Sequence, residues 1–151
     1  MASWQEFEQA EPELAARVRQ CFALGKHATM ATLRFDGSPR ISGTEVEFGE
    51  DSLHLGMMPG SRKAADLRHD PRLALHCPTV DPPEGDPGSW LGDAKIAGTA
   101  VEVSDPGSDD QGHRFRIDVT EVVLTAVAPS ADHLRILSWH PDRGVEETAR
   151  W

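Results

Sequence analysis

The clearest chemical pattern in this sequence is the triplet Ser61, Arg62 and Lys63, which stands where a short helix is expected to begin. A helix start carries unpaired N–H groups and a partial positive charge, so two cations there add unfavourable repulsion. A bound anion would remove that cost, because helix amides, a serine hydroxyl and two cations together form a phosphate site. The alternative is a pair of solvated surface cations, which are common in proteins.

The neighbouring residues suit this interpretation. Gly60 lets a ligand approach the backbone closely, and Pro59 stiffens the entry to the helix. The helix is expected over residues 61–70, with Leu67 as its main core residue. It ends where Asp70 precedes a proline, because the residue before proline disfavours helical geometry.

Alternating apolar residues predict a chain rich in strands around this helix. The strands are expected at residues 27–35, 40–48, 52–58, 72–77, 93–103, 115–127 and 133–140, and an N-terminal helix at residues 6–24. The first three strands should form an antiparallel meander. Residues 78–92, rich in proline and glycine, and the acidic residues 104–112 should be loops. The sequence therefore predicts a mainly β fold, with residues 1–151 forming a single domain built as a small antiparallel barrel without exposed edges.

Composition excludes several classes of protein. The formal net charge of −10 argues against binding to nucleic acid and to an anionic membrane surface. No apolar run is long enough to span a membrane, and the acidic N-terminus does not resemble a signal peptide. The two cysteines, Cys21 and Cys77, form no C-x-x-C motif, so a cytoplasmic protein with reduced thiols is expected.

Two stretches carry a resemblance to a known family: ATLRFDGSPRISGTEVEF at residues 31–48 and SLHLGMMPGSRKAADLRHDPRLALHC at residues 52–77. In this order they resemble the pyridoxamine 5'-phosphate oxidase-like, FMN-binding split-barrel family over about residues 25–103. The resemblance implies a split β-barrel homodimer with a flavin or deazaflavin in a groove between the two subunits. It also implies a flavin-dependent oxidoreductase acting on a small molecule.

The resemblance also implies cofactor-binding residues. Ser61, Arg62 and Lys63 match the family's phosphate-binding run, and Arg40 matches an arginine that helps to hold the same phosphate. The stretches expected along the flavin ring are Ser42, Gly43 and Thr44, and Gly56 and Met57. Asp93 and Lys95 loosely match the strand that the family sends under the ring, and either Trp139 or the C-terminal segment is expected to reach the partner subunit's site.

The chain also departs from the family. The stretch HLRILSWHPDRG lacks the R-L-H-D-R-like substrate motif of true pyridoxine-phosphate oxidases, so oxidation of a vitamin B6 phosphate is not expected. Where relatives often have an apolar residue, this chain has Glu45. Alternation along a strand places Glu45 and Glu47 opposite Ser42 and Thr44, so Glu45 is expected to face away from the cofactor.

Other functions remain open at this stage. FMN is the simpler cofactor, and the deazaflavin coenzyme F-420 is the main alternative, with Arg68 and Arg72 as candidates for contacts to its acidic tail. A non-catalytic carrier of flavin or haem is a second class, in which His54 or His76 would be the axial ligand. A structural barrel without a cofactor is a third. No spacing of histidine and cysteine predicts a metal site, and the cysteines are expected to be buried apolar residues.

Overall fold

The computed structural model describes residues 1–103 and 112–151, so most of the acidic loop expected at residues 104–112 lies outside the described part. The described helices are α1 (Trp4–Ala10), α2 (Pro12–Phe22), α3 (Arg62–His69) and the 3-10 turn η1 (Pro87–Ser89). The strands are β1 (Ala28–Leu33), β2 (Pro39–Thr44), β3 (Val46–Phe48), β4 (Leu53–Met57), β5 (Arg72–His76), β6 (Asp93–Glu102), β7 (His113–Val127), β8 (Leu134–His140) and β9 (Gly144–Arg150). None of the helices in this part of the chain is long and apolar enough to cross a membrane.

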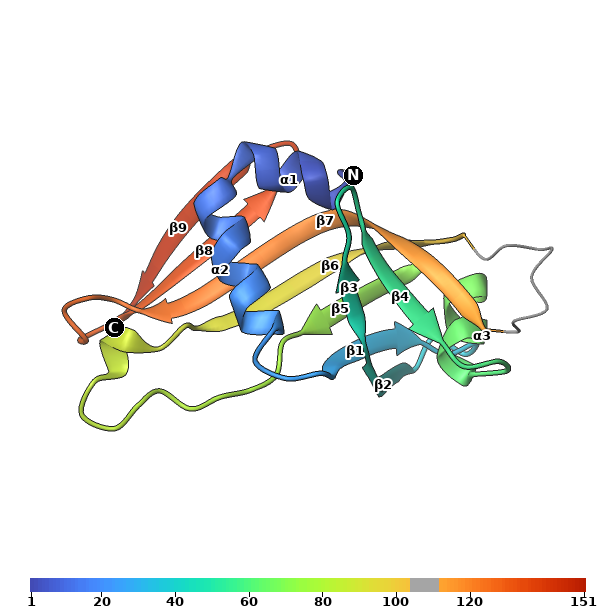
Figure 1. Cartoon of the computed structure of the whole chain (residues 1–151), viewed down its shortest axis with the longest axis horizontal. Helices are drawn as coiled ribbons and strands as arrows, with labels where there is room; N and C mark the ends of the chain where they lie inside the picture. Colours follow the sequence, from blue (N-terminus) through green and yellow to red (C-terminus); the bar gives the residue numbers. More distant parts are fainter. Residues whose placement is uncertain (104–111) are drawn as a thin grey trace.

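The strands form a barrel, and a single residue of the chain joins the two ends of its sheet. Seven strands follow one another by antiparallel pairing in the order β2-β1-β5-β6-β7-β4-β3, so β2 and β3 lie at opposite ends of this path. Only Glu45 separates the two strands in sequence, and the chain therefore joins the two ends of the sheet. Figure 1 shows the resulting curled sheet, and the predicted mainly β, antiparallel split barrel is confirmed.

The break at Glu45 overturns two details of the prediction. The single strand expected over residues 40–48 is wrong, because β2 pairs with β1 whereas β3 pairs with β4. The three-strand meander is wrong for the same reason, since β1–β2 and β3–β4 are separate hairpins. An uninterrupted strand would have to keep one set of neighbours, and the interruption lets the chain turn the corner of the barrel.

The N-terminal helix expected over residues 6–24 is two helices. In α1, the Ser3 hydroxyl accepts a hydrogen bond from the Glu6 amide, and the Glu6 carboxylate accepts one from the Ser3 amide. Pro12 is the first residue of α2, where its missing N–H removes no helical hydrogen bond. Both helices lie against the sheet (Figure 1), and the aromatic residues of α1 join its core.

An aromatic cluster links these helices to the barrel. Trp4 and Phe7 are fully buried, with ring centroids 5.0 Å apart. Trp4 also packs edge-on against Phe48 of β3, and Phe7 packs against Trp139 of β8 at 4.7 Å. Because Trp139 is only 4% exposed and packs in this core, the expectation that it reaches a partner's site is wrong.

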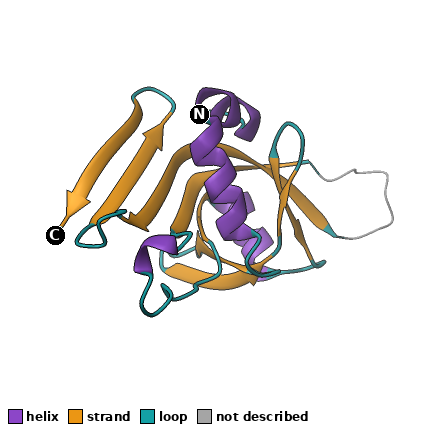
Figure 2. Ribbon diagram, turned by 60° about the vertical axis from the view of Figure 1, so that its left-hand side comes forward, coloured by secondary structure: helices purple, strands orange, loops and turns teal. Residues whose placement is uncertain are grey.

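The C-terminal segment forms a strand that the sequence did not indicate. The seven expected strands become nine in the described residues, through the break at Glu45 and the addition of β9. β9 pairs along its whole length with β8, and β8 continues the sheet from the C-terminal end of β7. Figure 2 shows this hairpin extending away from the barrel.

The helix α3 and the proline-rich loop follow the prediction. Ser61 caps α3, Leu67 is 3% exposed, and the helix ends at Asp70 before Pro71. The loop at residues 78–92 holds only the short turn η1, and the Trp90 indole N–H donates to the Val80 carbonyl at 2.7 Å. This hydrogen bond links the two ends of the loop.

Candidate functional site

A groove of about 690 Å³ opens on the barrel surface beside the start of α3. β2, β3 and β4 supply most of its surface, and its walls carry His27, Glu45, Glu47 and Lys63. Its remaining lining consists of glycine, methionine, threonine and valine: Gly43, Thr44, Val46, Gly56, Met57 and Met58. The groove lies within the size range of small-molecule and cofactor sites.

Two glycines keep this groove open. Gly43 on β2 and Gly56 on β4 are both exposed, and a Cβ added at either would meet no atom within 4 Å. The space that side chains would occupy is therefore part of the groove. A flat ligand could lie against bare backbone here, and the strand's amide and carbonyl groups would be within its reach.

The N-terminal turn of α3 provides amides for an anion. The Ser61 hydroxyl accepts a hydrogen bond from the Ala64 amide at 3.4 Å, and the Ser61 carbonyl accepts one from the Ala65 amide. Among the described residues, the amides of Arg62 and Lys63 have no such acceptor. These two amides are the ones that an anion at the helix start can bind. The Ser61 hydroxyl is already used as the helix cap.

Lys63 connects this helix to the groove. Its ammonium donates a hydrogen bond to the Gly43 carbonyl at 2.7 Å, and Lys63 lines the groove. This contact holds the cation beside β2, next to the space that Gly43 leaves open. Among the candidate cations, only Lys63 lies in the groove together with Gly43, Gly56 and Met57 in the described part of the chain.

Arg62 and Arg40 lie on the other side of the α3 start. Both line a second depression of about 390 Å³, together with Arg34, the exposed Phe35, Asp36 and Asp66. The candidate residues are therefore brought together in two places: glycines and Lys63 in the groove, and three arginines in the depression. Sequence matching treated Arg40, Arg62 and Lys63 as one phosphate site, and the structure separates them.

Arg40 is held by a buried carboxylate. Its Nε donates to Asp66 Oδ2 at 2.7 Å, and the Thr32 hydroxyl donates to the same oxygen at 2.7 Å. Burial of Asp66 opposes its ionisation, but the hydrogen bonds from Arg40 and Thr32 outweigh burial and hold the pKa of this carboxyl below its usual value. Asp66 therefore remains charged and fixes Arg40 against α3.

Ser42 does not line the groove, whereas Thr44 does. Both hydroxyl oxygens are buried and have no hydrogen-bond partner within the described residues. The intervening Gly43 faces outward, so this stretch offers its backbone to the groove.

The predicted alternation is confirmed, because Glu45 and Glu47 are exposed whereas Thr44 is buried, but Glu45 lines the groove instead of lying away from it. Ser42 and Thr44 take the inward positions of β2, and alternation along the chain puts Gly43, Glu45 and Glu47 on the outer face. All three of these outer residues line the groove. The carboxylate of Glu45 lies 3.6 Å from both the Lys26 ammonium and His27 Nε2. Sequence reasoning missed His27 and Glu45 as groove residues because it placed the cofactor on the inward face. The same alternation, applied to the outer face, would have found them.

The remaining candidates lie elsewhere. His54 on β4 and His76 on β5 are outside the groove, and among the described residues no group of three potential ligands could hold a metal ion. Lys95 and Asp93 on β6 do not line the groove either. Arg68 pairs with Glu102 at 2.6 Å. Arg72 pairs with Asp70 at 2.7 Å.

The two cysteines are buried as expected, and they lie together. Cys21 Sγ lies 3.4 Å from the Gly92 carbonyl oxygen, and the Ala94 amide donates to Cys77 Sγ at 3.2 Å. A hydrogen bond from Cys21 lowers the pKa of Cys77 to about 6 against the opposing effect of burial, while the pKa of Cys21 is raised. The pair lies outside the groove.

Comparison with known proteins gives a family match across most of the chain. Residues 14–144 match the family model described as pyridoxamine 5'-phosphate oxidase. No curated protein matches the sequence.

Solved structures share the fold at low sequence identity. An FMN-binding, pyridoxamine 5'-phosphate oxidase-related protein from Nostoc punctiforme superposes with a TM-score of 0.65 at 11% identity, covering 92% of this chain and 95% of its own. The haem storage protein HutZ from Vibrio cholerae gives 0.53 at 14% identity, covering 73% and 89%. An F420 reductase gives 0.52 at 13% identity, covering 68% and 92%. At these identities the likeness establishes the fold alone.

Proposed function

The chain belongs to the pyridoxamine 5'-phosphate oxidase family, and from this premise we propose that it is an FMN-dependent oxidoreductase acting on a small molecule. The observation that carries the proposal is the groove in which Gly43 and Gly56 leave the strands bare beside Lys63. This is a site for a flat ring with an anionic end. A structural barrel without a ligand would gain nothing from two outward glycines, which weaken strands.

The residues present suit FMN. Lys63 and the amides of Arg62 and Lys63 would bind its phosphate, and the backbone at Gly43 and Gly56 would lie along its ring. When bound, FMN supplies the redox chemistry, either two electrons or a hydride. The chain's own contribution is to bind the ring and orient it, and Met57 and Met58 cover apolar surface beside it. We assign no acid or base.

The substrate is proposed to differ from pyridoxine phosphate. The segment that would carry the R-L-H-D-R-like motif forms β8 and the turn after it, in the hairpin that extends away from the barrel. Its sequence lacks the motif.

A deazaflavin is the second candidate, and one observation favours it. The depression on the other side of the α3 start is lined by Arg34, Arg40 and Arg62, together with Asp36 and Asp66. Because Asp66 holds Arg40, Arg34 and Arg62 are the cations that could bind an acidic tail continuing from a phosphate at the helix start. Arg68 and Arg72, the earlier candidates for this role, are each paired with a carboxylate. This cofactor would restrict the chemistry to hydride transfer.

We also propose that a second copy of this chain covers the groove. Ile41 on the outer face of β2 is 75% exposed, and Met58 in the groove is 79% exposed. Large apolar side chains grouped at a cofactor groove mark an interface. Light scattering tests this: a dimer is expected, and a monomer would contradict it.

The proposed function is tested by the absorbance spectrum of the protein as purified, followed by mass spectrometry of the molecule released on denaturation. A flavin spectrum with released FMN is expected, and released deazaflavin would select the second candidate. Reoxidation of the reduced bound flavin by an electron acceptor separates an enzyme from a carrier. A haem absorbance band without flavin would overturn the proposal.

A further inference from the structure

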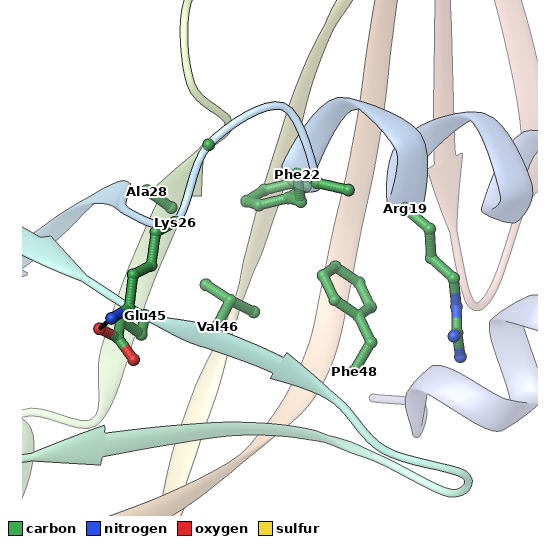
Figure 3. Close-up of a pocket in the computed structure, with 9 residues that line it drawn as sticks. Arg19, Phe22, Lys26, Ala28, Glu45, Val46 and Phe48 are labelled. Atoms are coloured by element: carbon green, nitrogen blue, oxygen red, sulfur yellow. Dashed lines mark ion pairs between the residues drawn. The ribbon is translucent and has the colours of Figure 1, made fainter.

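A second cavity adjoins the groove, between the C-terminal part of α2 and β3. It has a volume of about 320 Å³. Figure 3 shows Phe22, Val46 and Phe48 lying between the Lys26–Glu45 ion pair and Arg19. The cavity therefore has an apolar floor and a charged rim.

The floor is suited to a flat apolar group. Phe22 is 7% exposed and Ala28 is 6% exposed, so both are already fixed by the core. The rings of Phe22 and Phe48 meet edge-on, with centroids 5.6 Å apart, and Val46 lies beside them. An aromatic ring placed here gains edge contacts and burial without ordering new side chains.

The rim can supply a cation for a negative charge on that ligand. It carries Lys26 and Arg19, which pair with Glu45 and Glu8 respectively. The Lys26–Glu45 pair is 3.6 Å long, with the two side chains 75% and 58% exposed, so it contributes little and exchanges readily for another anion. Arg19 pairs with Glu8 and lies over the Phe48 ring at 5.5 Å, which leaves Lys26 as the cation free to move.

The cavity shares part of its lining with the groove. Glu45 and Val46 line both of them, and they are the residues at which the chain passes from β2 to β3. A molecule in the cavity therefore contacts two of the residues that line the groove in which we place the flavin.

We propose that this cavity binds a small aromatic carboxylate, with the ring on Phe22, Val46 and Phe48 and the carboxylate paired with Lys26. The binding itself does not depend on a flavin. That this ligand is the substrate of the oxidoreductase rests on the proposed function.

The test uses 1-naphthoate as probe and flavin-free protein, with affinity measured by calorimetry and the site located by NMR. The wild-type protein should bind 1-naphthoate, with shifts at Phe22 and Val46. Lys26→Gln should weaken binding about three- to tenfold, while the neutral 1-naphthalenemethanol should bind both proteins equally. Ala23→Trp, at an exposed position on the cavity edge, should block both probes.

Arg143→Gln is the matched control, because it removes one positive charge at the turn before β9. It should bind 1-naphthoate as the wild type does. Equal losses in Lys26→Gln and Arg143→Gln, or shifts that map elsewhere, would overturn the proposal. A separate FMN titration distinguishes the two claims: FMN binding without naphthoate binding overturns only the cavity, and naphthoate binding without FMN binding overturns only the proposed function.

Discussion

Arg40 and Asp66 are joined by a 2.7 Å hydrogen bond between the guanidinium Nε and the carboxylate Oδ2. The pair connects β2 to α3, and the Thr32 hydroxyl extends it to β1. Three elements around the candidate site therefore depend on one buried carboxylate, which is 6% exposed. Asp66 fixes the orientation of α3, and with it the positions of Arg62 and Lys63.

Asp66→Asn should destabilise the protein by about 2–3 kcal/mol, because it removes the charge that pairs with the mostly buried Arg40. The effect should depend on pH. The folded-state pKa of Asp66 lies below its unfolded value, so its contribution is present above about pH 4 and is lost as the pH falls through the folded-state pKa. Urea denaturation of both proteins at several pH values measures this. A difference that stays constant down to pH 2 would contradict the assignment.

Lys63→Ala should weaken FMN binding about 10- to 100-fold, because it removes a charge-assisted contact to the phosphate. Lys95→Ala is the control, since Lys95 is an exposed lysine of β6 outside the groove. Fluorescence titration with FMN measures both variants.

Arg62→Ala separates the two cofactor candidates. The Arg62 side chain lies in the arginine depression, so Arg62→Ala should reduce FMN affinity less than Lys63→Ala does. The same variant should reduce the affinity for a deazaflavin with an acidic tail more than it reduces the affinity for FMN. The same titration with both cofactors measures this. If Arg62→Ala and Lys63→Ala impair FMN binding equally, the division into groove and depression has no functional meaning.

Gly56→Val should block the groove without harming the fold. The new side chain would enter open space on a strand, where valine is favoured over glycine, so the melting temperature should stay constant or rise. FMN affinity should fall more than tenfold. Gly88→Val, in η1, provides a comparable substitution outside the groove and should leave affinity unchanged. Normal FMN binding by Gly56→Val would show that the ring lies elsewhere.

Cys21→Ala should raise the pKa of Cys77 from about 6, because the mutation removes the hydrogen bond that stabilises the Cys77 thiolate. Ultraviolet absorbance of the thiolate as a function of pH should show Cys77 ionising at a lower pH in the wild type than in the variant. An unchanged titration curve would mean that the thiols do not share a hydrogen bond.

Local signals in the sequence predicted most of the elements around the site. The N-cap Ser61, the stop at Asp70-Pro71 and the alternation along β4 and β7 each specify one element without knowledge of the rest. The break between β2 and β3 at Glu45 could not be predicted from the sequence, because the residues on both sides of it keep the same inward and outward alternation. β9 is polar because it lies in a hairpin outside the barrel core, and so it gave no periodic apolar signal.

For the site, the sequence predicted which residues take part better than it predicted where their side chains lie. The motif match identified Lys63, Gly43 and Gly56, which do line one groove. It could not show that Arg40 is held by Asp66, because that contact joins positions far apart in the sequence. It also placed Ser42 and Thr44 together at the cofactor, whereas Thr44 lines the groove and Ser42 does not.

The crystal structure of this protein with FMN tests the central claim most directly. The account predicts the phosphate at the amides of Arg62 and Lys63, with the Lys63 ammonium beside it and the ring against Gly43 and Gly56. A phosphate held instead by Arg34 and Arg40, or a ring bound away from these glycines, would contradict it.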